Sequence, residues 1–147
     1  MILVTGRQRI AAKAFGQTAA GGGLDPLFDI RCTWGVSGTT DGIRLIISTF
    51  ADEASASLAI RALLDEGLIA CGSRVPGVTS IYRWKDKVEE STEVQVILKT
   101  SAEAASRAMA RLAELHPYEV PEIMEVEPSS AGIPYASWIR ESLSRFE

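Results

Sequence analysis

The chain has 147 residues, of which 46% are hydrophobic and 23% charged, values typical of one globular domain with a packed core. Its net charge of −4 argues against a nucleic-acid-binding protein, because phosphate binding requires concentrated lysine and arginine. No apolar run approaches the roughly 20 residues that cross a bilayer, and two cysteines are too few for a disulfide framework. We therefore expect a cytoplasmic protein that binds neither nucleic acid nor membrane.

The first 42 residues differ in composition from the rest of the chain. They contain no acidic residue before Asp25, and they include the glycine-rich stretch "AAGGG" at 19–23. They also lack a continuous apolar core of signal-peptide length. We expect a flexible N-terminal extension over residues 1–42 and a folded domain over 43–147, because the composition changes at "DG", residues 41–42.

The folded part is expected to begin with a strand and a helix. "IRLIISTF" (43–50) is a β-branched apolar run with the length of a buried strand. Asp52 then stands at the N-cap position of a helix, and Gly67 ends that helix. The apolar residues at helical spacing between them are Leu58, Ala59, Ala62 and Leu63.

A long antiparallel hairpin is expected next. Residues 68–84 are rich in strand formers but are interrupted at Pro76-Gly77, where a proline-bearing strand should bulge or bend. "KDK" (85–87) forms the expected tip, and the second strand covers 88–100. Its alternation places Val94, Val96 and Leu98 on one face and Glu93, Gln95 and Lys99 on the other.

The remaining elements are a helix, a strand and a last helix. Thr100 and Glu103 match a capping box, and Pro117 ends the helix that this box begins. The expected apolar stripe of that helix is Ala105, Ala108, Met109, Leu112 and Leu115. A fourth strand follows at 122–127. Pro134 suits the first position of the last helix, whose expected buried stripe is Tyr135, Trp138, Ile139 and Leu143.

The order β-α-β-β-α-β plus a terminal helix predicts an α+β protein with the ferredoxin-like split βαβ fold and an antiparallel sheet. The hairpin is long enough to overhang such a sheet, and an apolar overhanging edge favours pairing with another subunit. We therefore expect a symmetric oligomer formed by intersubunit sheet extension. Its candidate interface residues are Val78, Ile81, Tyr82 and Trp84.

Four stretches in a fixed order carry a resemblance to a known family. "ACGSRVPGVTSIYRW", "EVQVILKT", "HPYEVPEI" and "YASWIRESL" resemble the CutA family of divalent-cation tolerance proteins, collinearly from Ile43 to Leu143. The resemblance implies a ferredoxin-like homotrimer related in architecture to the PII signalling proteins. It further implies a non-enzymatic binding or scaffold protein of the metal response, with copper or another divalent cation as ligand and no metal required for folding.

The resemblance also implies a metal site that this chain only partly matches. Some bacterial members are thought to bind copper through a cysteine near the end of the first strand and two adjacent histidines before the proline. Ser48 and Leu115 occupy the cysteine position and the first histidine position, which leaves His116. Copper prefers thiolate and several imidazoles. The candidate metal ligands are His116, Glu119, Glu122 and Cys71, with a symmetry mate supplying what one chain lacks.

Each donor has a structural alternative. His116 is either a metal ligand or proton carrier, or the residue that ends the helix and bonds a neighbouring carbonyl or carboxylate. Cys71 is either a thiolate ligand or a small core residue.

A second functional class also remains open at this stage. Tyr82, Trp84, Glu89, Lys99 and Tyr118 either line a cleft between subunits, where a PII-like sensor binds a small metabolite or nucleotide, or simply pack the interface. No nucleophile–base pair and no glycine-rich phosphate loop is evident, so we do not expect an enzyme.

Overall fold

The computed structural model describes residues 42–146, and the predicted extension over 1–42 lies outside them apart from Gly42. The described chain forms β1 (Ile43–Phe50), α1 (Glu53–Asp65), β2 (Cys71–Trp84), β3 (Lys87–Ser101), α2 (Ala102–Leu115), β4 (Met124–Val126) and α3 (Ile133–Leu143). Among these residues, none of the helices combines the length and hydrophobicity needed to cross a lipid bilayer.

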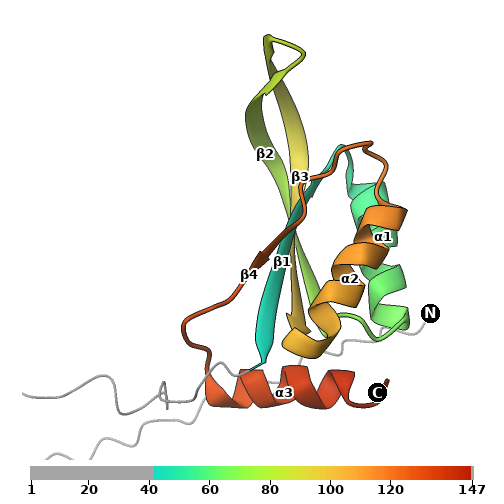
Figure 1. The fold of residues 1–147 in the computed structure, drawn as a ribbon, viewed down its shortest axis with the longest axis vertical. Coiled ribbons are helices and arrows are strands. Elements are labelled where there is room, and N and C mark those ends of the chain that lie inside the picture. The colour runs from blue at the N-terminus through green and yellow to red at the C-terminus, as the bar shows by residue number, and fades with distance from the viewer. Residues whose placement is uncertain (1–41, 147) are drawn as a thin grey trace, which may run out of the picture.

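The strands form one antiparallel sheet in the order β2-β3-β1-β4, with α1 and α2 together on one face (Figure 1). This arrangement confirms the predicted α+β, ferredoxin-like fold. The helix α3 crosses the end of the sheet opposite to the hairpin tip (Figure 1). The fourth strand is shorter than predicted, since only Met124–Val126 pair with β1.

The β2–β3 hairpin projects beyond the body of the sheet, as predicted (Figure 1). Its register pairs Trp84 with Lys87, and the two turn residues Lys85 and Asp86 both have positive φ, at 46° and 66°. A two-residue turn of this kind matches the twist of the two strands. The tip is therefore one residue shorter than "KDK". The predicted irregularity is confirmed as a bulge between Pro76 and Val78.

The main core lies between the sheet and the helices α1 and α2. Its fully enclosed side chains include Ile46, Phe50, Leu63, Val96, Leu98 and Leu112. Leu58 was expected on the apolar stripe of α1, but 69% of its surface is exposed. Ala59 and Leu63 are buried as predicted, together with Ala56 and Ile60, and Leu58 lies about 200° around the helix from Ala56.

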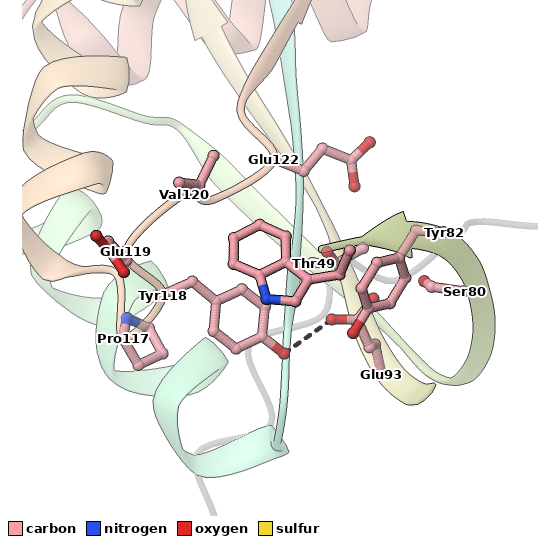
Figure 2. Close-up of a pocket in the computed structure, with 10 residues that line it drawn as sticks. Thr49, Ser80, Tyr82, Glu93, Pro117, Tyr118, Glu119, Val120 and Glu122 are labelled. Atoms are coloured by element: carbon pink, nitrogen blue, oxygen red, sulfur yellow. Dashed lines mark hydrogen bonds between the residues drawn. The ribbon is translucent and has the colours of Figure 1, made fainter. Parts of the chain in front are cut away.

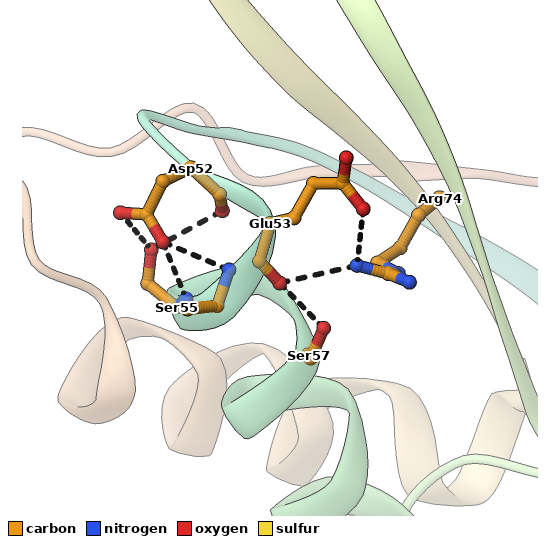
Figure 3. A network of polar contacts seen from close by, with 6 residues as sticks. Asp52, Glu53, Ser55, Ser57 and Arg74 are labelled. Carbon is orange, nitrogen blue, oxygen red and sulfur yellow. Dashed lines mark hydrogen bonds and ion pairs between the residues drawn. The ribbon is translucent and has the colours of Figure 1, made fainter.

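The N-terminus of α1 is held by a side-chain network that also reaches β2 (Figure 3). Asp52 is the N-cap, as predicted, and its carboxylate accepts the N–H groups of Ala54 and Ser55 at 2.8 Å. The Ser55 N–H bond, ahead of the Ser55 hydroxyl, lowers the pKa of Asp52. Arg74 on β2 contacts the Glu53 carboxylate at 3.0 Å and so ties the hairpin to the helix.

The predicted cap of α2 is wrong by one residue. The N-cap is Ser101, whose Oγ accepts the N–H of Ala104 at 3.2 Å. Thr100 stays in β3 opposite Arg44, and its buried hydroxyl donates to the carbonyl of Leu68 at 2.6 Å. Because the strand continues through Thr100, its side chain is directed to the core and not to the helix end.

The buried stripe of the last helix matches the prediction at Ile139 and Leu143 and differs at its other positions. Ala136, Ile139 and Leu143 pack with Ile43 in a second core cluster. Tyr135 and Trp138 were expected to be buried, but they remain 45% and 38% exposed and stack on each other with 5.5 Å between ring centroids. Each directly precedes a buried residue, Ala136 or Ile139, so both lie about 100° around α3 from the buried stripe.

Candidate functional site

A pocket of about 580 Å³ lies between the hairpin and the connection from α2 to β4 (Figure 2). The hairpin and β1 supply one wall, and the connection supplies the other. The lining residues are Thr49, Ser80, Tyr82, Trp84, Glu93, Pro117, Tyr118, Glu119, Val120 and Glu122. The volume is in the range of pockets that hold small molecules.

The strand register explains why the hairpin residues meet on one side. Ser80, Tyr82 and Trp84 alternate along β2 and share a face. Glu93 on β3 pairs with Val78, so its side chain lies on that same face, away from α1 and α2. Pro117 ends α2, and the chain after it passes the edge of β1 to bring Tyr118 to this face (Figure 2).

Glu93 and Tyr118 form the polar link across the pocket. The Tyr118 hydroxyl donates to Glu93 Oε1 at 2.8 Å, and Glu93 is only 7% exposed (Figure 2). Burial, followed by the hydrogen bond to Glu93, raises the pKa of Tyr118 to about 12. The phenol therefore stays protonated and remains the donor in this bond at neutral pH.

His116 lies behind the pocket with both ring nitrogens engaged. Nε2 is 3.0 Å from the carbonyl oxygen of Thr49, and Nδ1 accepts the backbone N–H of Tyr118 at 3.2 Å. A carbonyl can only accept and a backbone N–H can only donate. The ring is therefore the neutral tautomer with its proton on Nε2. It also stacks on Phe50 with 4.2 Å between centroids.

This geometry fits the structural interpretation of His116 as the residue that ends α2. It is the C-cap of the helix and is 9% exposed. Burial lowers its pKa, against a smaller upward effect of the Thr49 carbonyl. A metal ion reaches either nitrogen only if one of the two hydrogen bonds breaks.

The other candidate metal ligands separate into two places. Glu119 and Glu122 line the pocket. Cys71 pairs with Lys99, which pairs in turn with Leu45, so Cys71 lies at the opposite end of β1 from Phe50 and His116. Within residues 42–146 no three histidine, cysteine or acidic side chains are placed to hold a metal ion together.

Cys71 has a neighbour of its own at that end of the sheet. Burial, and then the interaction with Cys71, raises the pKa of Tyr135. Cys71 is partly exposed and not disulfide-bonded. It therefore belongs to the region where α3 packs on the sheet, away from the pocket.

The predicted cleft residues are only partly brought together. Tyr82, Trp84 and Tyr118 line the pocket. Glu89 is the cross-strand partner of Tyr82 but is not part of the lining, and the Lys99 ammonium donates to the Ile97 carbonyl and to Ser73. The remaining lining residues were not predicted as site residues from the sequence: Thr49, Ser80, Glu93, Pro117 and Val120. Counting the register back from the hairpin turn would have placed Glu93 opposite Val78, on the same face as Ser80 and Tyr82.

The four-stranded order, the paired helices and the long hairpin define a ferredoxin-like α+β protein with a ligand-sized pocket beside its hairpin. The family profile of the CutA1 divalent ion tolerance protein matches residues 44–142. The chain belongs to this family.

Individual relatives agree with that assignment. The divalent-cation tolerance protein CutA of Thermus thermophilus is 38% identical over 98 residues, which are 67% of this chain and 95% of that protein. The Escherichia coli K12 (DH10B) protein of the same name is 36% identical over 99 residues, 67% of this chain and 88% of its own. The crystal structure of CutA from Xylella fastidiosa superimposes with a TM-score of 0.67 at 40% identity, covering 70% of this chain and 99% of that one.

We predict that stability falls on mild acidification because of His116. Burial holds its folded pKa below the unfolded value, so the unfolded chain binds the proton more readily. The stabilisation is complete above the unfolded pKa near 6.5 and is lost as pH falls through the folded pKa. Urea unfolding at one protein concentration should therefore give a lower free energy at pH 5.5 than at pH 7.5.

The control is His116→Gln, whose amide can still donate to the Thr49 carbonyl. Because the chain has a single histidine, this variant should lose most of the pH dependence in that window. An equal pH dependence in both proteins would contradict the assignment of a neutral, buried imidazole.

Proposed function

We propose that the protein acts in divalent-cation tolerance as a non-enzymatic homotrimer that serves as a stable scaffold and binds metal only weakly. Membership in the CutA1 family supports the tolerance role. The observation that carries the assembly is the sheet itself, which has a long free edge at β2 and an apolar face that α1 and α2 leave uncovered.

The uncovered face favours association. Residues paired across β4, β1 and β3 share this face, and α3 packs against it at Ile43. Its remaining apolar members are half-buried or exposed: Leu45, Ile47, Val75, Ile97, Met124 and Val126. A cluster of exposed apolar side chains of this kind on a small protein marks an interface.

The two free edges favour a ring. The sheet ends at β2 on one side and at β4 on the other, so pairing of β2 with a second copy's β4 joins unlike edges. Such head-to-tail contacts generate a closed ring when the rotation closes. A ring of three agrees with the trimer that the family resemblance implies, and the projecting hairpin supplies the length that spans between copies.

The proposed affinity for a metal ion is weaker than the pair of histidines described for the family would give. His116 uses both nitrogens, and Ser48 and Leu115 stand at the other ligand positions. One chain therefore does not provide the donor set that copper prefers. We assign the weak binding of copper or another divalent cation to the carboxylates of Glu119 and Glu122, complemented by a neighbouring copy.

The geometry also supports a non-enzymatic role. Ser48 Oγ lies 3.3 Å from His116 Nε2, which is the spacing of a hydroxyl nucleophile and its base. Ser48 has no exposed surface, however, and Nε2 carries the proton that it donates to Thr49. A base must accept a proton and a nucleophile must reach its substrate, and this pair does neither.

The trimer predicts a particle of three times the 15.8 kDa chain mass in multi-angle light scattering at micromolar concentration. Ile81→Lys should shift the particle toward monomers, because the hairpin would carry a charge into the interface. The matched control is Leu58→Lys on the outer surface of α1, since Leu58 and Ile81 are 69% and 67% exposed. A monomeric wild type, or equal behaviour of the two variants, would contradict the assembly.

The metal assignment predicts that the double variant Glu119→Gln, Glu122→Gln weakens Cu(II) binding severalfold in calorimetric titration of the full chain. His116→Gln should leave the affinity within about twofold, because the imidazole is not available to the ion. The reverse result, with loss in His116→Gln and none in the double variant, would place the metal at the histidine.

A further inference from the structure

The pocket beside the hairpin carries negative charge without a compensating side chain. Its ionisable lining residues are Glu93, Glu119 and Glu122, together with two tyrosines, and the lining contains no lysine, arginine or histidine. Glu93 is only 7% exposed. Among the described residues, no lysine or arginine forms an ion pair with it. A buried carboxylate with one neutral hydrogen-bond donor is costly unless a cation joins it.

The same pocket has aromatic walls. Tyr82 and Trp84 come from β2, and Tyr118 comes from the connection after α2. Figure 2 shows Tyr82 and Tyr118 on either side of the Glu93 carboxylate, with the Tyr118 hydroxyl bonded to it. The faces of such rings attract a positive charge electrostatically, most strongly when that charge is carried by a poorly hydrated organic group.

Size and donor geometry favour an organic cation over a bare metal ion. The volume of about 580 Å³ suits a molecule and not a single ion. The described acidic side chains do not converge as three ligands on one point. In Figure 2 Glu119 and Glu122 are directed away from the rings, which leaves Glu93 as the carboxylate between the aromatic side chains.

We propose that this pocket binds a small organic cation whose alkylated ammonium group lies against Tyr82, Trp84 and Tyr118 and pairs with the Glu93 carboxylate. Tyr118 has a positioning role, since its hydroxyl occupies Oε1 and fixes the direction of the remaining oxygen. Thr49 and Ser80 offer hydroxyl groups to a polar tail of the ligand. The proposed metal ligands Glu119 and Glu122 line the same pocket but are directed away from these rings (Figure 2).

The test compares choline with 3,3-dimethyl-1-butanol, its uncharged carbon isostere, by calorimetric titration of the full chain in buffer with EDTA. The two probes have the same shape, so their difference isolates the charge. We expect choline to bind at least about tenfold more tightly than the isostere, the size that a desolvated cation–aromatic contact and one carboxylate support.

Three variants locate the cation. Glu93→Gln keeps an acceptor for the Tyr118 hydroxyl and should weaken choline binding about tenfold while leaving the isostere unchanged. Trp84→Leu, at a side chain that is 45% exposed, should weaken choline in the same direction and is not expected to disturb folding. The matched control is Glu89→Gln on the same hairpin, outside the lining, which should bind choline like the wild type.

The opposite outcomes are equally defined. Equal affinity for the two probes, no choline binding up to about 10 mM, or equal effects of Glu93→Gln and Glu89→Gln would each overturn the proposal. If Glu93→Gln unfolds, as thermal unfolding would show, Trp84→Leu alone decides. Because EDTA removes metal ions and the isostere controls for shape, failure of the copper prediction leaves this result unaffected.

Discussion

The candidate site depends on two hydrogen bonds made by one imidazole ring. His116 donates to the Thr49 carbonyl at the end of β1 and accepts the Tyr118 N–H at the start of the connection to β4. These two bonds attach the connection to the sheet at the point where Pro117 has ended α2. Tyr118 is then held where its hydroxyl can bond to Glu93, and the pocket wall depends on this position of Tyr118. The histidine of the motif that suggests metal binding therefore has a structural role, which is to attach the connection to the sheet.

The attachment of this connection to the sheet also relates the fold to the two roles proposed for the protein. On one side of the sheet the helices α1 and α2 bury the core, and on the other the apolar face and the β2 edge are left for other copies of the chain. The pocket lies on the second of these sides, between the projecting hairpin and the connection from α2 to β4. Its acidic and aromatic lining suits a cation, while the surrounding surface suits assembly.

Much of the fold could be predicted because the local signals agree with the tertiary structure. β1 was predicted to the residue. Asp52 caps the start of α1, Gly67 follows the end of α1, and Pro117 follows the end of α2, as their chemistry requires. The predicted burial of Leu58, Tyr135 and Trp138 was wrong, because apolar residues were counted without fixing which face of the helix is directed toward the sheet. The Thr100 cap failed because the strand continues one residue further.

The site was harder to predict because it depends on register. Tyr82, Trp84, Tyr118, Glu119 and Glu122 are in the lining, but Cys71 and Lys99 lie at the far end of the sheet, a distance that only strand pairing reveals. Glu93 was missed for the same reason. The availability of His116 could not be judged at all from sequence, since its partners Thr49 and Tyr118 become neighbours only in the fold.

The most direct test of this account is the tautomer of His116, measured by nitrogen-15 NMR of the imidazole at pH 7 before and after Zn(II) is added. The structure predicts a protonated Nε2, an unprotonated Nδ1 that accepts a hydrogen bond, and the same spectrum with metal. A proton on Nδ1, or a shift of either ring nitrogen on addition of Zn(II), would contradict it.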